Sequence, residues 1–293
     1  MSSDVTWSML FVISPVTGRV AMERKRREFG LDTHQPSSHA LADTATTASD
    51  PKLRSAARDA LQSVVWLRQV PAGTLDALAA QAVLHRVPAG SLLFEQAETP
   101  VFAQFLLAGS IELLGLRDRV ETLIELLRPV DLIIPAAVLR GQPYLTRARV
   151  YEEAHLLLVP AEAFRDAVAS DHALCRALLG CLTAQFRRQV RLQKNLKLRS
   201  TEERVGCYLV SLLGSSDTDI IVRLPVEKHL IASQLGMTRE TFSRALSGMA
   251  RFGMLVRGET VQVANAAVAR AHFPLDPLID GSEPISPLED RKA

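Results

Sequence analysis

Apolar residues recur with two different periods along the chain, and the change of period divides it into regions. Between residues 52 and 82 they recur at every third or fourth position, which predicts helices with a break at Pro71. Between residues 83 and 160, short apolar or alternating runs are separated by turn residues roughly every ten positions. This second pattern predicts a small antiparallel sandwich or barrel, with turns at Gly90 and Gly109.

A long helix is predicted after the strands. Residues 161–200 contain no proline and only one glycine, Gly180, and their leucines repeat at steps of three and four. A helix of about thirty residues, at ~1.5 Å per residue, is longer than one small domain covers. We therefore expect it to pair with its own copy in a homodimer, the alternative being a surface helix packed on its own domain. The interface residues predicted from the period are Leu178, Leu179, Leu182, Phe186, Gln189 and Leu196.

The stretch IASQLGMTRETFSRAL, residues 231–246, has the spacing of a helix-turn-helix. Gly236 tolerates the positive φ of the turn, and the small Ala232 lets the two helices approach each other closely. Thr238 is suited to cap the second helix, and Gly253 to end it. The apolar residues expected to be buried are Ile231, Leu235, Met237, Phe242, Ala245, Leu246, Met249 and Phe252.

A predicted hairpin follows directly, which makes the motif a winged helix-turn-helix. The hairpin is MLVRGETVQVA, residues 254–264, with Arg257-Gly258 at its turn. The alternative is an ordinary pair of helices with solvated charges. The residues predicted to bind DNA are Thr238, Arg239, Glu240, Thr241, Ser243, Arg244 and Arg257.

The charge distribution agrees with nucleic-acid binding. The net charge of the chain is only +2. Residues 223–257 nevertheless hold six Lys or Arg against two Glu, and residues 258–293 hold three basic residues against six acidic ones. The basic surplus therefore surrounds the predicted helix-turn-helix.

Other classes of protein are disfavoured by the sequence. The three cysteines, Cys175, Cys181 and Cys207, have no C-x-x-C spacing, which is typical of core thiols in a cytoplasmic protein. No apolar run reaches the ~18–20 residues of a membrane span. The sequence has no phosphate-binding glycine loop, nucleophile elbow or metal-spaced His/Glu pair, so we expect no enzyme.

These elements resemble the CRP/FNR family of bacterial transcription regulators over about residues 55–265. The resemblance rests on the β-rich region, the long helix, EERVGCYLVSLL (202–213), VRLPVEKHLIASQLGMTRETFSRALSGMARFGMLV (222–256) and the wing. Two segments, DLIIPAAVLRGQPYL (131–145) and LKLRSTEERVGCYL (196–209), are most similar to the FtrB-type subgroup.

The resemblance implies an α+β fold in three parts. An N-terminal β-roll, of the cyclic-nucleotide-binding jelly-roll type, is followed by a long dimerisation helix and a C-terminal winged helix-turn-helix. The partners it implies are double-stranded DNA, a second copy of the chain and RNA polymerase. The expected regions are an N-terminal extension that is disordered or lies upstream of the true start (1–50), the sensor domain with flanking helices (51–169), the dimerisation helix (170–200), the DNA-binding domain (201–268) and an acidic tail containing prolines (269–293).

The resemblance also implies a DNA site. The family has a form of recognition helix in which glutamate, serine and arginine read bases, and Glu240, Ser243 and Arg244 match it. That form implies a palindrome with TTGA-like halves. Arg244 is suited to guanine O6/N7, Glu240 to cytosine N4, and Ser243 to a thymine or a phosphate.

Canonical cyclic-nucleotide binding is not expected. The family's cyclic-nucleotide sensors carry a glycine-glutamate pair and then an arginine followed by serine or alanine. The matching positions hold Val130-Asp131, without glycine, and Tyr144-Leu145. The effector pocket predicted instead is largely apolar and consists of Ile133, Ile134, Val138, Leu139, Tyr144, Arg147 and Arg149.

Other effectors stay open at this point. The cysteines that hold an iron–sulfur cluster in some family members are missing before Cys175. Haem is one candidate, with His85 and His155 as ligands, and an unknown apolar effector or no effector at all are others. The alternative function is therefore a haem-binding or small-molecule-binding sensor whose effector gates DNA binding or contact with another protein.

Overall fold

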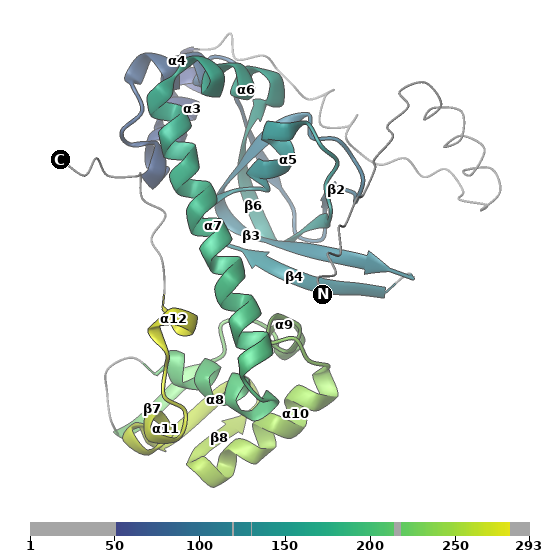
Figure 1. The fold of residues 1–293 in the computed structure, drawn as a ribbon, viewed down its shortest axis with the longest axis vertical. Helices are drawn as coiled ribbons and strands as arrows, with labels where there is room; N and C mark the ends of the chain where they lie inside the picture. The colour runs from purple at the N-terminus through teal and green to yellow at the C-terminus, as the bar shows by residue number, and fades with distance from the viewer. Residues whose placement is uncertain (1–50, 119, 130, 214–217, 282–293) are drawn as a thin grey trace, which may run out of the picture.

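A computed structural model describes residues 51–118, 120–129, 131–213 and 218–281. It has a β-sheet domain with flanking helices, one long helix, and a C-terminal domain of helices with a small sheet (Figure 1). This architecture confirms the predicted α+β fold class. The predicted N-terminal extension and the end of the predicted tail, residues 282–293, lie outside the described residues.

The N-terminal helices cover one face of the first sheet. They are α3 (Pro51–Ser63), a short 3-10 turn (Val65–Leu67) and α4 (Ala72–Ala79). Trp66 is fully buried and stacks on Phe105 with 6.1 Å between ring centroids, and Phe164 meets Phe105 edge-on at 5.9 Å. This aromatic cluster joins the helices to the sheet in one core.

The first sheet forms the sensor domain. Within the described residues its strands pair in the order β1-β6-β3-β4, with β2 also on β6 and β5 also on β3, all antiparallel. The strands are β1 (Val83–Val87), β2 (Leu92–Phe94), β3 (Phe102–Arg117), β4 (Val120–Leu127), β5 (Asp131–Leu132) and β6 (Arg147–Pro160).

The turn predicted at Gly109 is wrong. Gly109 lies inside the 16-residue strand β3, which joins two runs that the sequence pattern separates. Its φ is +83°, and a β-carbon there would lie 2.1 Å from the carbonyl oxygen of Glu153 on β6. Glycine therefore allows β3 to bend and to approach its neighbour β6 closely. In the sequence, a glycine between two apolar runs looks the same as a turn.

The long helix expected over residues 170–200 is present, and a separate shorter helix precedes it. After the short helix α5 (Pro135–Arg140), α6 (Ala161–Ser170) and α7 (His172–Leu198) are separated by Asp171 in an extended conformation. The Asp171 carboxylate accepts from the amides of Ala173 and Leu174 at 2.8 and 3.0 Å, and so caps α7. None of the helices in the described part of the chain is both long and apolar enough to cross a membrane.

The inner face of α7 packs on its own sensor domain. Leu178 is 2% exposed in the same core as Trp66, and Leu182 packs partly against that core. Gln189 donates to Glu125 of β4 at 2.6 Å. The prediction that Leu178 faces a second copy is therefore wrong, because the helical period alone does not distinguish the inner apolar stripe from the outer one. Gln189 is half-buried and makes its hydrogen bond within the chain.

The C-terminal domain begins directly after α7. Its elements are α8 (Thr201–Ser211), β7 (Thr218–Arg223), α9 (Lys228–Gln234), α10 (Arg239–Gly248), a 3-10 turn (Met249–Phe252), β8 (Met254–Arg257), β9 (Thr260–Asn265), α11 (Ala266–His272) and α12 (Pro277–Asp280). The strands pair in the order β7-β9-β8, and the domain has its own hydrophobic core. Figure 1 shows α7 running from the sensor sheet to this domain.

Candidate nucleic-acid interface

The turn between α9 and α10 is built on a glycine, as predicted. Gly236 has a φ of +65°, and its amide donates to the Ser233 carbonyl at 2.9 Å. The Met237 amide closes the turn on the Ala232 carbonyl at 3.0 Å. A β-carbon on Gly236 would lie 2.4 Å from Cδ2 of Leu196 on α7. Both the backbone angle and the close approach therefore favour glycine.

The angle between the two helices is filled by apolar residues. Those that the sequence assigned to this contact are buried or partly buried in the domain core. Helix α10 ends at Gly248 rather than Gly253, because the last turn tightens to a 3-10 turn. The buried residues are Ile231, Ala232, Leu235, Phe242, Leu246 and Met249, and the partly buried ones are Met237, Ala245 and Phe252.

The polar face of α10 is exposed. Arg239, Glu240, Ser243 and Arg244 all lie on it, since offsets of one, four and five residues share one side of a helix. Ser247 lies on the same exposed face and was missed by the sequence analysis. Extending the helical period by one more turn, to the eighth residue after Arg239, would have found it.

The start of α10 is capped as predicted. The Thr238 hydroxyl accepts from the Thr241 amide at 3.2 Å. Thr241 is half-buried and hydrogen-bonds to Thr238 through its own hydroxyl, so it belongs to the cap rather than to the exposed face. Hydrogen bonds from its own backbone N–H and from Thr238 lower the pKa of Glu240, which is therefore ionised at neutral pH.

The wing is the hairpin of β8 and β9. Its two-residue turn is Gly258-Glu259, with φ of +58° at the glycine, so the turn predicted at Arg257-Gly258 is off by one residue. Arg257 is the last residue of β8 and is exposed. Arg223 of β7 pairs with Glu259 at 2.7 Å and ties the wing tip to the neighbouring strand.

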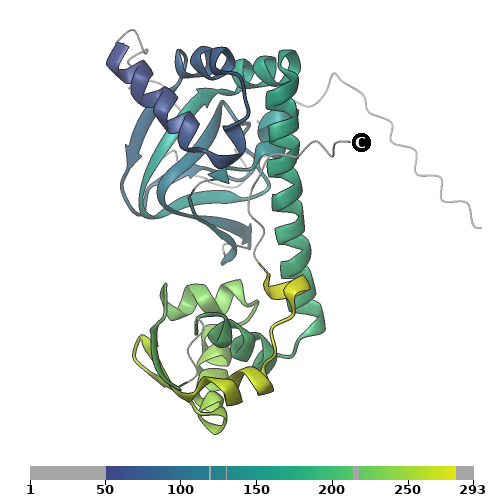
Figure 2. The same ribbon diagram turned by 90° about the vertical axis from the view of Figure 1, so that its left-hand side faces the viewer.

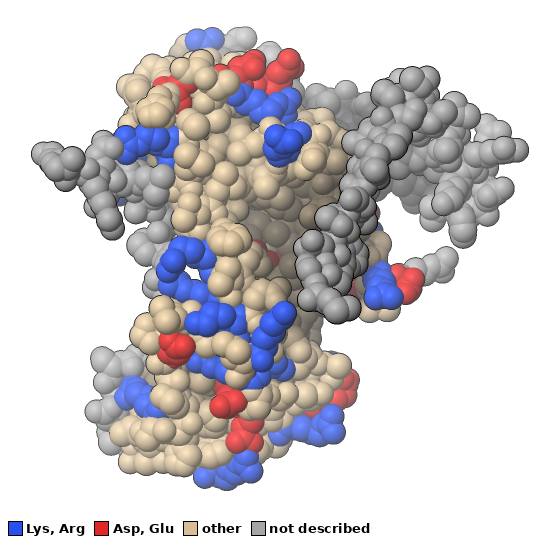
Figure 3. Space-filling model, in the orientation of Figure 1, with Lys and Arg blue, Asp and Glu red and all other residues tan. Residues whose placement is uncertain are grey.

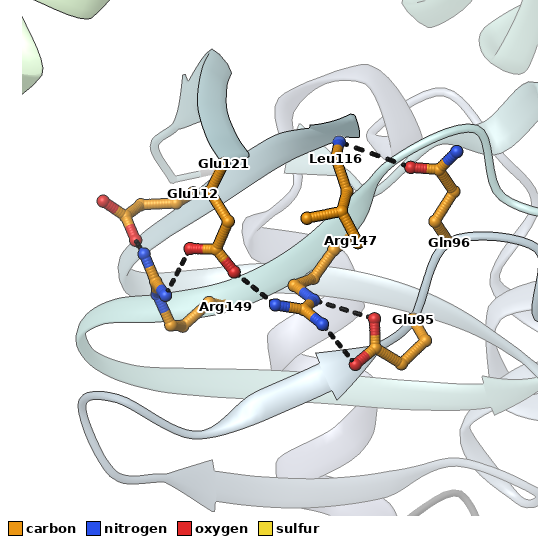
Figure 4. Close-up of polar contacts among 7 residues, drawn as sticks. All are labelled: Glu95, Gln96, Glu112, Leu116, Glu121, Arg147 and Arg149. Carbon is orange, nitrogen blue, oxygen red and sulfur yellow. Dashed lines mark hydrogen bonds and ion pairs between the residues drawn. The ribbon is translucent and has the colours of Figure 1, made fainter. Parts of the chain in front are cut away.

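In the sensor domain, the two arginines of the predicted pocket are held by glutamates (Figure 4). Arg147 donates twice to Glu95, at 2.7 Å from both Nε and Nη2, and also pairs with Glu121. Arg149 pairs with Glu112 and with Glu121, each at 2.9 Å. Partial burial would raise the pKa of Glu121, but the ion pairs outweigh it and lower the pKa. The network thus neutralises both cations with three carboxylates.

The remaining pocket residues do not line one cavity, which corrects that prediction. Val138 is fully buried and Leu139 packs against the same helix-side core. Ile133 and Tyr144 belong instead to the core inside the sheet, where Tyr144 stacks on Phe94 with 3.7 Å between ring centroids, and Ile134 packs against this second core. Within α5 itself, Ala137 belongs to the core inside the sheet and Val138 to the helix-side core, so the split runs through the whole segment.

The two predicted haem ligands do not face each other. In the pairing of β1 with β6, His85 lies opposite Leu156, whereas His155 lies opposite Arg86. Because successive residues of a strand point to opposite faces, the two histidines lie on opposite sides of the sheet. His155 is exposed and His85 is half-buried, so they do not form a pair of axial ligands. The described residues also contain no cluster of His, Cys, Asp and Glu able to hold a metal ion.

Comparison with known proteins assigns both domains. Residues 203–268 match the Crp-like helix-turn-helix domain, and residues 84–171 match the cyclic nucleotide-binding domain. The chain is a transcription regulator of the CRP/FNR family. Members of this family bind DNA through the helix-turn-helix and are not enzymes, which confirms both predictions. Among curated proteins, none is similar enough in sequence to count as a relative.

Several solved structures share the fold. FixK2 of Bradyrhizobium japonicum is 18% identical, with a TM-score of 0.52 over 65% of this chain and 96% of that one. A CRP-family transcriptional regulator of Thermus thermophilus is 22% identical, with a TM-score of 0.50 over 64% and 95%. The c-di-GMP responsive regulator CLP of Xanthomonas campestris is 17% identical, with a TM-score of 0.52 over 67% and 100%.

In this CRP/FNR regulator the helix-turn-helix is docked on the sensor domain through α9. The Ser233 hydroxyl accepts from the Leu123 amide of β4 at 3.2 Å and donates to the Leu123 carbonyl at 3.4 Å. Leu230 is buried against Leu123 and Leu114 of the β3–β4 hairpin. The first helix of the motif, α9, therefore contacts the sensor domain, and the polar face of the second helix, α10, stays exposed.

Gly236→Ala should destabilise the regulator by about 1–2 kcal/mol, because a residue with a β-carbon resists the left-handed conformation. The new methyl group would also have to displace the side chain of Leu196. Chemical denaturation followed by circular dichroism measures the change. The control is Gly248→Ala, where φ is −66° and a β-carbon meets nothing within 4 Å, so stability should be unchanged or slightly higher. Equal stability of both variants would contradict this account of the turn.

Proposed function

We propose that this regulator binds DNA as a homodimer and reads a palindrome with TTGA-like half-sites. The observation that carries the proposal is the exposed row Arg239, Glu240, Ser243 and Arg244 at the N-terminal end of α10. The N-terminal residues of a recognition helix are those that reach base edges in a major groove. The resemblance of Glu240, Ser243 and Arg244 to one form of the family's recognition helix supports the TTGA-like sequence.

Each residue of the row has a role that its chemistry fits. Arg244 donates two hydrogen bonds to guanine O6 and N7, and the ionised Glu240 accepts from the N4 amino group of the paired cytosine. Ser243 contacts a thymine or a phosphate. Arg239 and Thr238, at the start of α10, contact the DNA backbone. Arg257 of the wing does the same.

The dimer is proposed to form along the outer face of α7. Exposed positions on this helix follow one another at steps of four, three, four, three and four residues, which is the a/d spacing of a coiled coil. Phe186 is 69% exposed, Leu179 49% and Val190 41%. Of the interface first predicted, Leu179 and Phe186 belong to this outer stripe. Its members are Leu179, Thr183, Phe186, Val190, Gln193 and Lys197.

A dimer of this kind sets the form of the DNA site. Its two recognition helices are related by a two-fold axis and enter successive major grooves ~34–36 Å apart. The half-sites are therefore inverted and lie about one helical turn apart. RNA polymerase is the proposed further partner. The segments 131–145 and 196–209, which resemble the FtrB-type subgroup, support the proposal that the chain belongs to that subgroup.

The sensor domain is proposed not to respond to a cyclic nucleotide. A bound phosphate needs a cation that is not already neutralised, and Arg147 and Arg149 are paired with Glu95, Glu112 and Glu121. The tight stacking of Tyr144 on Phe94 also fills the sheet interior near this network.

Gating by a haem or another small molecule is the second candidate for the sensor. The positions of His85 and His155 support only a haem held by one of them. The exposed polar face of α10 favours DNA binding over protein contact as the output of the sensor. A recognition helix must expose base-reading side chains, whereas a helix that does not enter a groove is under no such constraint.

Arg244→Ala should weaken binding by about 1–3 kcal/mol per half-site and relax the preference at one guanine. Glu240→Ala should relax the preference for the opposing cytosine. Arg239→Ala should weaken binding to all sequences alike and lower the salt dependence of binding. Selection from random duplexes, followed by titration at two salt concentrations, measures these effects.

The control for this experiment is Arg251→Ala, which removes an exposed arginine that lies beyond the C-terminal end of α10 and pairs with Glu202 of α8. It should leave the base preference unchanged. An Arg244→Ala variant with the full base preference of the wild type would show that α10 does not read DNA as proposed.

Phe186→Glu should weaken dimerisation at least about tenfold, or about 1.4 kcal/mol, because it buries a charge in an apolar seam. Sedimentation velocity across a concentration series measures the dissociation constant. Leu145→Glu makes the same substitution at a residue that is 85% exposed on the sensor domain, and it should leave the dimer intact. A wild-type protein that is monomeric at micromolar concentration would rule out the proposed interface.

Cyclic AMP should not bind at micromolar concentrations, because the arginines that could hold its phosphate are already paired. Isothermal titration calorimetry with the purified dimer is the measurement. A dissociation constant in the micromolar range or tighter would overturn the proposal, and loss of that binding in Arg147→Ala would locate the site in the glutamate network.

A further inference from the structure

After the DNA-binding domain is complete, the chain returns to the long helix. Helix α11 closes the domain core with Ala266 and Ala269, and Phe273 follows at 3% exposure. Helix α12 then packs against α7 rather than against its own domain. Figures 1 and 2 show α12 beside the lower end of α7 in both views. The matched helix-turn-helix domain ends at residue 268, so this return segment lies beyond it.

The return segment, residues 274–281, is attached to α7 by charged and polar contacts. Asp280 accepts from both terminal nitrogens of Arg199, at 2.6 and 2.5 Å, and the two side chains are only 15% and 9% exposed. Arg191 donates to the carbonyl of Gly281 at 2.6 Å, and Lys194 donates to the carbonyl of Leu278 at 3.4 Å. The Arg199–Asp280 pair is shielded and bidentate, unlike an ordinary surface ion pair.

The charges of the two surfaces are complementary. Lys and Arg side chains gather over the lower half of α7 on the face shown in Figure 3. The return segment carries Asp276 and Asp280, and Asp276 also caps α12 by accepting from the Leu278 amide at 2.8 Å. Burial would raise the pKa of Asp280, but hydrogen bonds from Arg199 and from the Asp276 amide outweigh it and lower the pKa. The carboxylate is therefore ionised at neutral pH.

The attachment is located at the joint between the two domains. Arg199 is the extended residue between α7 and α8, with φ −115° and ψ 140°, and Ser200 begins α8 with a capping box. The other end of the return segment is fixed to α8. A β-carbon on Gly206 would lie 2.3 Å from the Phe273 ring, and the Cys207 thiol lies 3.8 Å from the Pro274 carbonyl oxygen. The segment thus bridges both sides of the joint.

We propose that residues 274–281 form a strap that sets the angle of the DNA-binding domain on α7, with Arg199 and Asp280 as positioning residues for DNA reading. The inference rests on the proposed dimer. With α7 paired to its copy, the angle at Arg199 and the docking of α9 on β4 together set the separation of the two recognition helices. The strap therefore selects the spacing between half-sites, while α10 selects the bases within each half.

The test measures binding to palindromes whose half-sites are separated by zero to four base pairs more or fewer than the preferred spacing. Asp280→Asn keeps the shape of the side chain but removes its charge, and a chain ending at Phe273 removes the strap while keeping the domain core. Both should bind a wider range of spacings with the same base preference. Amide hydrogen exchange at residues 200–202 should also become at least several-fold faster.

Two controls separate the strap from general effects of charge or length. A chain ending at Gly281 keeps the strap, and Asp166→Asn removes an exposed carboxylate on α6. Both should bind the same range of half-site spacings as the wild type and show the same amide exchange at residues 200–202. The charge-reversed pair Arg199→Asp with Asp280→Arg should restore narrow spacing and slow exchange relative to either single change.

Unchanged spacing in Asp280→Asn and in the shortened chain would overturn the proposal, even if exchange at the joint became faster. Loss of base preference within the half-site, in contrast, would count against the proposed reading by α10. If the variants do not bind DNA, amide hydrogen exchange at residues 200–202 tests the strap instead. Exchange at the wild-type rate in the variants would then reject the proposal.

Discussion

Asp131 is a carboxylate with only 3% exposure, and a charge so buried is stable only when it is paired. Its partners are Gln185 and Arg188 of α7, which donate at 2.7 and 2.9 Å, and Arg188 also pairs with Glu125 of β4 at 2.6 Å. Burial dominates over the nearby arginine and raises the pKa of Glu125. The pairing fixes the rotation of α7 on the sensor sheet, and therefore decides which stripe of the helix faces outward.

Strand β4 connects this pairing to the helix-turn-helix. Along this strand, Glu121 holds the sensor arginines, Leu123 contacts α9, and Glu125 contacts α7. A bulge between Leu123 and Glu125 turns these two residues to opposite faces, so that one strand contacts α9 on one side and α7 on the other. The sensor domain, the proposed dimer helix and the scaffold of the recognition helix thus share a common support.

The helix-turn-helix could be predicted from the sequence, since its determinants are local: a turn glycine at 236, a cap at Thr238 and apolar residues at helical spacing. The sensor site could not be predicted, because the apolar residues between Ile133 and Tyr144 are divided between two cores. The outer stripe of α7 was only partly found, because Leu178 and Phe186 have the same period. Contacts with distant parts of the chain, among them the Trp66 core and Asp131, decide which stripe faces inward. The contact of Arg199 with Asp280 joins residues 81 positions apart, and no local pattern indicates it.

The central claim is that two chains, paired through α7, present two copies of α10 to one palindrome. The most direct measurement is the mass of the protein–DNA complex by light scattering, with affinities measured in parallel for a palindromic duplex and for a duplex with a single half-site. The account predicts two chains per palindrome and much weaker binding to the single half-site. One chain per palindrome, bound with the affinity of the half-site, would contradict it.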